Sequence, residues 1–114
     1  VQLCVNKLKS GGTLIFETPH PNSIVVSSTS FYLDLTHINP IHPETIQFVL
    51  DNCGIAESEI KFLSPFPEES QLDKIPLPAN QDAHETVEKI NHNINHLNQI
   101  LYGFQDYAVI GKKP

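Results

Sequence analysis

Several side chains capable of acid–base chemistry lie close together in one stretch of the sequence. They are Tyr32, Asp34, Thr36 and His37. A histidine can accept a proton from a hydroxyl group near neutral pH, and a nearby carboxylate can orient the imidazole ring. His37 is therefore the candidate general base of the chain, with Asp34 as its partner. The alternative is that Asp34, Thr36 and His37 only hold a loop together through hydrogen bonds between side chains and backbone.

Two histidines with a metal-binding spacing lie further along the chain. His92 and His96 are four residues apart in a stretch with helical periodicity, and this spacing can bind zinc. However, asparagines surround both histidines, and His84-Glu85 is not followed by a second histidine at the required offset. The sequence therefore favours a solvated polar face, and we predict no metal site.

Two other histidines adjoin prolines. His20 lies between Pro19 and Pro21, where it could face a pocket, although the sequence identifies no partner for it. His42 directly precedes Pro43, and two interpretations remain open for it: it caps a helix or it binds a ligand. Neither histidine is included in the predicted site.

The composition narrows the classes of function. The chain has 114 residues and a net charge of −6, it has no arginine, and its lysines are scattered except for Lys112-Lys113. Nucleic-acid surfaces need clustered positive charge, so we expect no nucleic-acid partner. No apolar run approaches the roughly 18 residues that a transmembrane helix needs, so no membrane span is predicted. Cys4 and Cys53 form no C-x-x-C pair, and we interpret them as buried thiols of a cytoplasmic protein.

Periodicity and turn residues predict an α/β fold. Apolar side chains recur at helical spacing in residues 1–10, 43–53 and about 82–102. The predicted strands are residues 13–17, 59–63 and 107–111. The first strand is expected to be fully buried, because it is a continuous apolar run that follows a helix and two glycines. Residues 18–42 are expected to form a long functional loop, and residues 64–80 an extended excursion.

Three segments of the chain together resemble one protein family. They are Gly12-Thr-Leu-Ile-Phe-Glu-Thr-Pro, Phe31-Tyr-Leu-Asp-Leu-Thr-His-Ile-Asn-Pro-Ile-His-Pro and Leu97-Asn-Gln-Ile-Leu-Tyr-Gly-Phe-Gln-Asp-Tyr-Ala-Val-Ile. Over nearly all of its length, the chain is similar to the C-terminal half of class I S-adenosylmethionine (SAM)-dependent methyltransferases. The closest subgroup is the bacterial set found with polysaccharide and glycan assembly, in which an F-Y-x-D-x-T-H-x-x-P segment follows the fifth strand. The resemblance implies a partial Rossmann-like sheet of about three strands, the last one antiparallel, with covering helices.

The resemblance also implies how the chain relates to a whole enzyme. Residues 1–114 would be the C-terminal, acceptor-side part of a methyltransferase domain, with a helical insertion at about 81–102 before the last strand. The lack of any methionine, even at position 1, likewise leads us to expect a piece of a longer protein. The G-x-G-x-G turn and the acidic residue that hold SAM in this family belong to the missing N-terminal half, so no SAM-binding residue is predicted here. We expect the fragment alone to bind SAM weakly or not at all and to be inactive.

For the parent protein, the resemblance implies methyl transfer to an oxygen atom of a sugar, glycan or small-molecule acceptor. Such an enzyme chiefly aligns the acceptor and excludes water, and a hydroxyl acceptor must also lose a proton. On this basis the predicted catalytic residues are His37 and Asp34. The predicted substrate-binding residues are Glu17, Phe31, Tyr32 and Thr36.

The segment at about 82–102 supports a second hypothesis. Its apolar residues step by 3, 4, 3 and 4 along the helix: Val87, Ile90, Ile94, Leu97 and Leu101. Such a stripe packs either on the sheet of its own chain or against another copy. Because two heptads are too short for a stable free coiled coil, packing on the sheet is the favoured interpretation. The alternative is a non-catalytic association module in which this helix forms a homo-oligomer.

Overall fold

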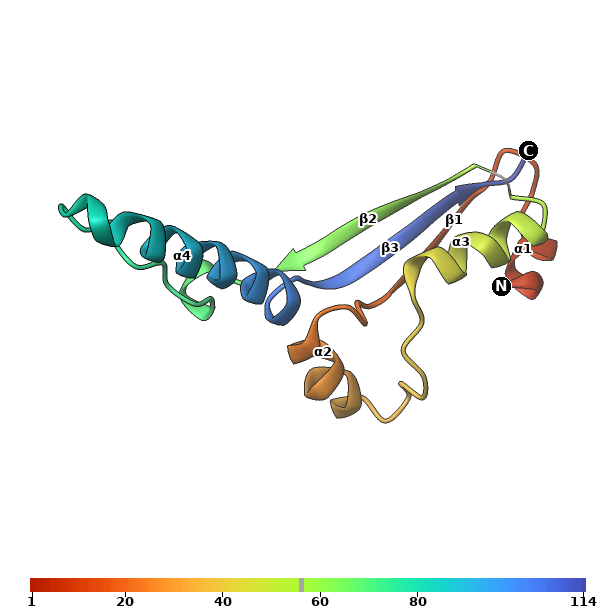
Figure 1. Ribbon diagram of the computed structural model, residues 1–114. Coiled ribbons are helices and arrows are strands. Elements are labelled where there is room, and N and C mark those ends of the chain that lie inside the picture. The colour runs from red at the N-terminus through yellow and green to blue at the C-terminus, as the bar shows by residue number, and fades with distance from the viewer. Residues whose placement is uncertain (56) are drawn as a thin grey trace.

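The computed structural model describes residues 1–55 and 57–114 (Figure 1). Its strands form one sheet and are β1 (Thr13–Pro19), β2 (Ser58–Pro65) and β3 (Phe104–Lys112). β3 lies in the centre and pairs antiparallel with both neighbours, so β1 and β2 run parallel to each other. The helices are α1 (Gln2–Lys7), α2 (Ile24–Ser28), α3 (Pro43–Asn52) and α4 (Gln81–Leu101), with short 3₁₀ helices η1 (Ser30–Leu33) and η2 (Glu68–Ser70). The predicted α/β fold, a three-stranded sheet with its last strand antiparallel, is confirmed.

The core lies on the face of the sheet where α1 and α3 pack (Figure 1). Its buried side chains are Val5, Ile46, Leu50, Ile55, Tyr107 and Val109. Pro43 starts α3, where its missing N–H leaves no donor unpaired, and Gly54 follows the helix with a φ of +88°. A Cβ atom at Gly111 of β3 would lie 2.7 Å from the Ile55 side chain. Glycine at this position therefore allows Ile55 to pack directly onto the central strand.

Two predictions about burial are wrong. β1 is not fully buried: Leu14 and Phe16 pack against the core, whereas Ile15 between them is 60% exposed. Successive strand side chains point to opposite faces, and among the described residues helices cover only one face. The thiols are not both buried either, since Cys4 is exposed and Cys53 is half-buried. The short helix α1 directs Val5 toward the core and leaves Cys4 outside it.

The segment between β1 and α3 contains more regular structure than predicted. α2 and η1 lie within the segment that was expected to be a loop. The Ser23 hydroxyl caps α2 by accepting a hydrogen bond from the Val26 N–H, and both Val26 and Phe31 are buried. Helices this short do not repeat an apolar pattern, so periodicity could not reveal them. Residues 34–42 contain no helix or strand and agree with the prediction of a loop.

α4 and the segment before it form an arm that extends away from the end of the sheet (Figure 1). We call residues 66–102 the arm and residues 71–80 the strap. No residue of α4 is buried, and its contact with α2 includes a hydrogen bond of 3.0 Å from the Ser23 hydroxyl to the Leu101 carbonyl. The predicted bounds of this helix are confirmed to within a residue, but its predicted packing on the sheet is wrong. The arm makes the chain elongated: the radius of gyration is 19.3 Å, whereas a compact chain of this length has about 13 Å.

Two asparagines of α4 hold the strap against the helix. Asn98 accepts a hydrogen bond from the Leu72 N–H at 2.8 Å and donates one to the Leu72 carbonyl at 2.9 Å. Asn91 makes the same pair of bonds with Ile75, both at 2.8 Å. Seven residues span roughly 10.5 Å along a helix, and three extended residues span about 10 Å. The two spacings match, so the strap runs extended and antiparallel to α4.

Candidate functional site

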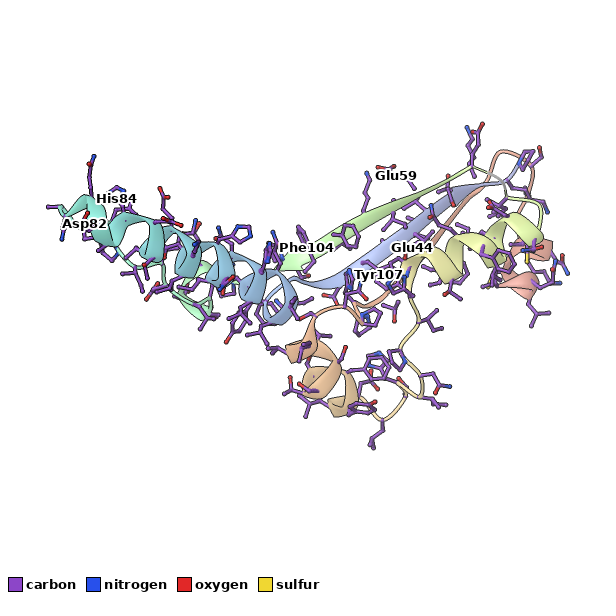
Figure 2. The ribbon with its side chains drawn as sticks, viewed as in Figure 1. Glu44, Glu59, Asp82, His84, Phe104 and Tyr107 are labelled. Carbon is purple, nitrogen blue, oxygen red and sulfur yellow. The ribbon has the colours of Figure 1, made fainter. Side chains whose placement is uncertain are left out.

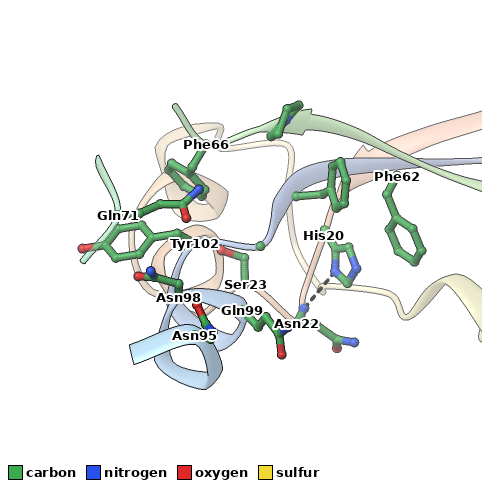
Figure 3. Close-up of a pocket in the computed structure, with 13 residues that line it drawn as sticks. His20, Asn22, Ser23, Phe62, Phe66, Gln71, Asn95, Asn98, Gln99 and Tyr102 are labelled. Carbon is green, nitrogen blue, oxygen red and sulfur yellow. Dashed lines mark hydrogen bonds between the residues drawn. The ribbon is translucent and has the colours of Figure 1, made fainter. Parts of the chain in front are cut away.

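A cleft of about 600 Å³ opens where β1 and β2 end (Figure 3). β1 ends at Pro19 and β2 at Pro65, and because these two strands are parallel, their carboxyl ends lie at the same edge of the sheet. Ligands of open α/β sheets bind outside the carboxyl ends of the strands. The cleft therefore occupies the position where a sheet of this kind binds small molecules.

Aromatic rings and amide groups form much of the wall of the cleft. The rings are Phe62, Phe66, Tyr102 and Phe104. Phe62 stacks on Phe104 with a centroid distance of 5.7 Å, and Phe66 meets Tyr102 edge-on at 5.6 Å. The amides include Asn22, Asn95 and Gln99. None of the described residues that line the cleft is an aspartate, glutamate, lysine or arginine. This surface suits an uncharged ligand with both apolar faces and hydroxyl groups.

His20 is the titratable imidazole of the cleft. Its backbone N–H extends the sheet by donating to the Gln105 carbonyl at 2.8 Å, which places the buried ring against Phe62 at 5.0 Å and Tyr107 at 5.7 Å. The Nδ1 atom accepts a hydrogen bond of 3.1 Å from the Asn22 N–H. Since a neutral imidazole carries one proton, that proton is on Nε2, and His20 can act as a hydrogen-bond donor.

Burial lowers the pKa of His20, because the charged imidazolium loses water on entering the protein. The nearby His42 lowers this pKa further, whereas Glu44 and Asp106 act in the opposite direction. His42 stands at the N-cap position of α3, but its side chain pairs with Glu44 and makes no capping hydrogen bond. The charges around His20 therefore come from the start of α3 and from β3, and the net effect favours the neutral ring.

Tyr107 connects the sheet to the segment before α3. Its ring is buried in the core, and its hydroxyl donates a hydrogen bond of 2.6 Å to the Ile41 carbonyl. Burial, together with the negative charge of Glu44, raises the pKa of Tyr107 to about 12. The hydroxyl group is therefore protonated at neutral pH and remains a donor to Ile41.

The structure brings four of the predicted site residues together in one turn. The backbone N–H and the hydroxyl of Thr36 both donate to Asp34 Oδ1, at 2.8 and 2.7 Å. These two bonds lower the pKa of Asp34. The His37 ring stacks on Phe31 at 4.9 Å, and its Nε2 lies 3.7 Å from Asp34 Oδ2. The turn thus contains side-chain to backbone hydrogen bonds of the kind expected if Asp34, Thr36 and His37 only hold the loop together. These bonds also fix the orientation of the His37 ring.

The hydrogen bonding of His37 is opposite to that of His20. His37 Nδ1 lies 3.0 Å from the Phe31 carbonyl oxygen, which can only accept, so Nδ1 carries the proton. In the neutral ring Nε2 is then free to take up a proton, and the ring is partly exposed. His37 has the tautomer that a general base needs, whereas His20 has that of a donor.

The other predicted site residues lie apart from this turn or at its edge. Glu17 is exposed on β1, opposite Ala108. Tyr32 is exposed and touches Phe31 edge-on at 5.1 Å. None of the six predicted residues is among those that line the cleft.

The aromatic residues of the cleft were not identified from the sequence. Phe62 and Phe66 lie on or just beyond β2, and the rule that ligands bind at carboxyl ends could have indicated them if applied to the second strand as well as the first. Tyr102 and Gln99 belong to a helix that was expected to cover the sheet, so its end was not considered as part of a site.

The described part of the chain offers neither a metal-binding cluster nor a membrane-spanning helix. The rings of His92 and His96 lie 4.2 Å apart, but no group of three or more His, Cys, Asp or Glu side chains among the described residues could hold a metal ion. Within the same residues, no helix combines the length and apolarity needed to cross a membrane.

Comparison with solved structures gives one informative match. The crystal structure of a SAM-dependent methyltransferase from Archaeoglobus fulgidus is 39% identical in sequence and superposes with a TM-score of 0.83. The chain is related to this methyltransferase. The match covers 98% of the present chain, so it includes the arm, and 49% of the other chain. The present chain thus spans about half the length of its relative. No protein-family model and no curated protein matches it.

The match confirms the coarser part of the predicted resemblance. It relates the chain to SAM-dependent methyltransferases and agrees with a partial methyltransferase fold. The narrower bacterial, polysaccharide-associated subgroup remains a prediction, as do the roles of the individual site residues.

Proposed function

We propose that this chain is the C-terminal, acceptor-side part of a SAM-dependent methyltransferase that methylates an oxygen atom of an uncharged sugar, glycan or small molecule. The observation that carries the proposal is the uncharged cleft at the carboxyl edge of a sheet related to that of a methyltransferase. The two free thiols suit an enzyme of the reducing cytoplasm.

The residues of this chain do not fit the methyl donor. Its five glycines, at positions 11, 12, 54, 103 and 111, contain no G-x-G-x-G motif, and none of the described cleft residues is an acid that could bind a ribose. No step is therefore derived through SAM. The donor site is assigned to the remainder of the parent protein, and the role of this chain is to bind and deprotonate the acceptor.

The cleft supplies the groups that would bind the acceptor. Phe62 and Tyr102 offer ring faces and edges to the apolar side of a sugar, and the amide of Gln99 can both donate to and accept from hydroxyl groups. His20 contributes a neutral N–H donor. A phosphorylated or carboxylated acceptor would find no arginine or lysine in this wall, so a neutral acceptor is favoured.

His37, which lies outside the cleft, is proposed to accept through Nε2 the proton of a hydroxyl group on a part of the acceptor that extends beyond the cleft, with Asp34 stabilising the imidazolium that forms. Support comes from the tautomer that the Phe31 carbonyl imposes and from the 3.7 Å separation between His37 Nε2 and Asp34 Oδ2. Phe31 and Thr36 hold the ring and the carboxylate in place. Tyr32 and Glu17, both exposed, are proposed to contact the acceptor from outside the cleft.

The experiment uses the full-length parent protein. SAM binding is measured by calorimetry, and methyl transfer is followed with methyl-labelled SAM and a panel of neutral oligosaccharides, each matched with a phosphorylated one. We expect SAM binding and labelling of a neutral acceptor. Full-length protein that does not bind SAM would refute the proposal, and labelling of phosphorylated sugars alone would refute the acceptor class.

Two variants separate the proposed roles. His37→Ala should lower kcat with little change in KM, because the base acts in the chemical step, typically by a factor of about 10² or more. Gln99→Ala should raise the KM for the acceptor with a smaller effect on kcat. Unchanged turnover in His37→Ala would remove its role as the base, and an unchanged KM in Gln99→Ala would argue against acceptor binding in the cleft.

A further inference from the structure

The wall of the cleft has two parts, which come from different regions of the molecule. The sheet region contributes His20, Phe62 and Phe104. The arm contributes the rings of Phe66 and Tyr102 together with several amide side chains. Figure 3 shows Phe66 and Tyr102 on one side of the cleft and His20 and Phe62 on the other. A molecule that fills the cleft would therefore touch both the sheet region and the arm.

The rings of the cleft form two separate clusters. On the sheet side, Phe62 stacks on His20 at 5.0 Å and on Phe104 at 5.7 Å. On the arm side, Phe66 and Tyr102 meet edge-on at 5.6 Å, and no ring pair among the described residues joins the two clusters. Phe62 and Phe104 are 46% and 43% exposed despite their stacking, so part of their ring surface is free to meet a ligand. Each cluster can thus pack against the apolar face of a sugar ring.

We propose that the two clusters are two sugar subsites, so that the acceptor is a neutral oligosaccharide of at least two units rather than a monosaccharide. The inference rests on the proposed function and narrows its acceptor class. The cleft volume of about 600 Å³ falls within the roughly 300–1,000 Å³ of sites that hold drug-sized molecules, which are larger than one sugar ring. An oligosaccharide can also extend beyond the cleft, as the proposed role of His37 requires.

Asn98 is the positioning residue of the arm subsite. Its amide bonds to both backbone groups of Leu72 hold the strap at the point where Gln71, the preceding residue, lines the cleft. The same two bonds therefore fix where the Gln71 amide meets a sugar hydroxyl group. Asn91 holds Ile75 in the same way but lies about two helical turns away and is not among the residues that line the cleft. Asn91 is thus a matched control for Asn98.

The dependence of affinity on acceptor length tests the proposal in the full-length parent protein. Calorimetry measures the binding of linear oligomers of glucose, mannose and galactose, each from the monosaccharide to the tetrasaccharide. In at least one series the disaccharide should bind about tenfold more tightly than the monosaccharide, because it gains contacts at the second subsite. Equal affinities within every series, or no binding of any of these sugars, would overturn the proposal.

Methyl transfer from labelled SAM to the same sugars separates this inference from the proposed function. Transfer to monosaccharides and longer sugars with equal kcat/KM would refute the two subsites and leave the methyltransferase function intact. Length-dependent binding without any transfer would support the two subsites and refute the proposed function.

Substitutions in the arm test which residues make the second subsite. Tyr102→Ala should abolish most of the tenfold preference for the disaccharide, because it removes the arm-side ring that meets Phe66. Asn98→Ala should reduce this preference roughly threefold, whereas Asn91→Ala, which removes the same kind of strap bonds, should leave it unchanged. A Tyr102→Ala variant that keeps the preference would overturn the arm subsite. Equal effects of the two asparagine variants would refute the positioning role of Asn98, and this pair tests the arm even if Tyr102→Ala folds poorly.

Discussion

The sheet with its two covering helices and the arm are stabilised in different ways. Tyr107, Ala108 and Val109 of the central strand are buried between the neighbouring strands and the helices, whereas α4 has no buried residue. Figure 2 shows side chains projecting above and below α4 in this view. The sheet region depends on apolar burial that joins distant parts of the sequence, and the arm depends on helical hydrogen bonds and on two asparagines that bind the strap. Substitutions in the sheet region should therefore change global stability, and substitutions in the arm should act locally.

Leu50→Ala should have the largest effect. Leu50 is fully buried between α3 and the sheet, and removing a buried leucine side chain typically costs about 2–5 kcal/mol of unfolding free energy. The matched control is Phe48→Ala on the same helix, where the ring is 68% exposed. Urea unfolding followed by far-UV circular dichroism measures both. Similar losses for the two variants would mean that the sheet region does not derive its stability from the face of α3 that contains Leu50.

Tyr107→Phe should have the second largest effect. The change keeps the buried ring but removes the hydrogen bond to the Ile41 carbonyl, which should cost about 1 kcal/mol. Tyr32→Phe is the control, because the Tyr32 ring is exposed. The same urea experiment applies, and an unchanged midpoint in Tyr107→Phe would mean that the segment before α3 is held to the sheet by packing alone.

Asn98→Ala should have an effect confined to the arm. It removes both hydrogen bonds to Leu72, and a loss of about 1 kcal/mol in the local opening free energy would speed exchange of the Leu72 amide roughly fivefold. Asn95→Ala, one turn away on the same helix, is the control. Hydrogen exchange measured by NMR should show the change at Leu72 with no change in the central strand. Loss of protection in β3 would mean that the arm and the sheet unfold as one unit.

Local sequence rules identified the elements of both regions but not how they pack. Pro43 and Gly54 delimited α3, and the apolar steps of α4 gave its bounds to within a residue. An apolar stripe, however, does not specify what covers it, so α4 was expected on the sheet. The asparagine pair at positions 91 and 98 contained a usable signal, because two amides seven residues apart match an extended strap. However, Asn91 was interpreted as part of a solvated face, and Asn98 was not considered.

For the candidate site too, local sequence patterns could group only residues that are close together in the chain. Asp34, Thr36 and His37 are close in sequence, so their grouping could be predicted from local spacing, and the structure holds them in one turn. The cleft instead combines the ends of β1, β2 and α4, which are far apart along the chain. These three ends lie together only because of the order of the strands in the sheet and the direction in which the arm leaves it. The antiparallel last strand itself was expected only from the resemblance to methyltransferases, since no local pattern encodes pairing between distant strands.

The smallest predicted effect is the dependence of stability on the protonation of His20, a residue at the junction between the two regions. Because burial lowers its pKa in the folded protein, the unfolded chain binds a proton at higher pH than the native chain does. Between the unfolded pKa of about 6.5 and the lower folded value, the free energy of unfolding should therefore fall as the pH falls, by at most about 1.4 kcal/mol per pH unit for one proton. An NMR titration of the histidine rings, with the His20 signal assigned by its absence in His20→Gln, should give a midpoint below 6.5 for this residue. A midpoint above that value would mean that Glu44 and Asp106 outweigh burial, and His20 would then be a cationic rather than a neutral donor in the cleft.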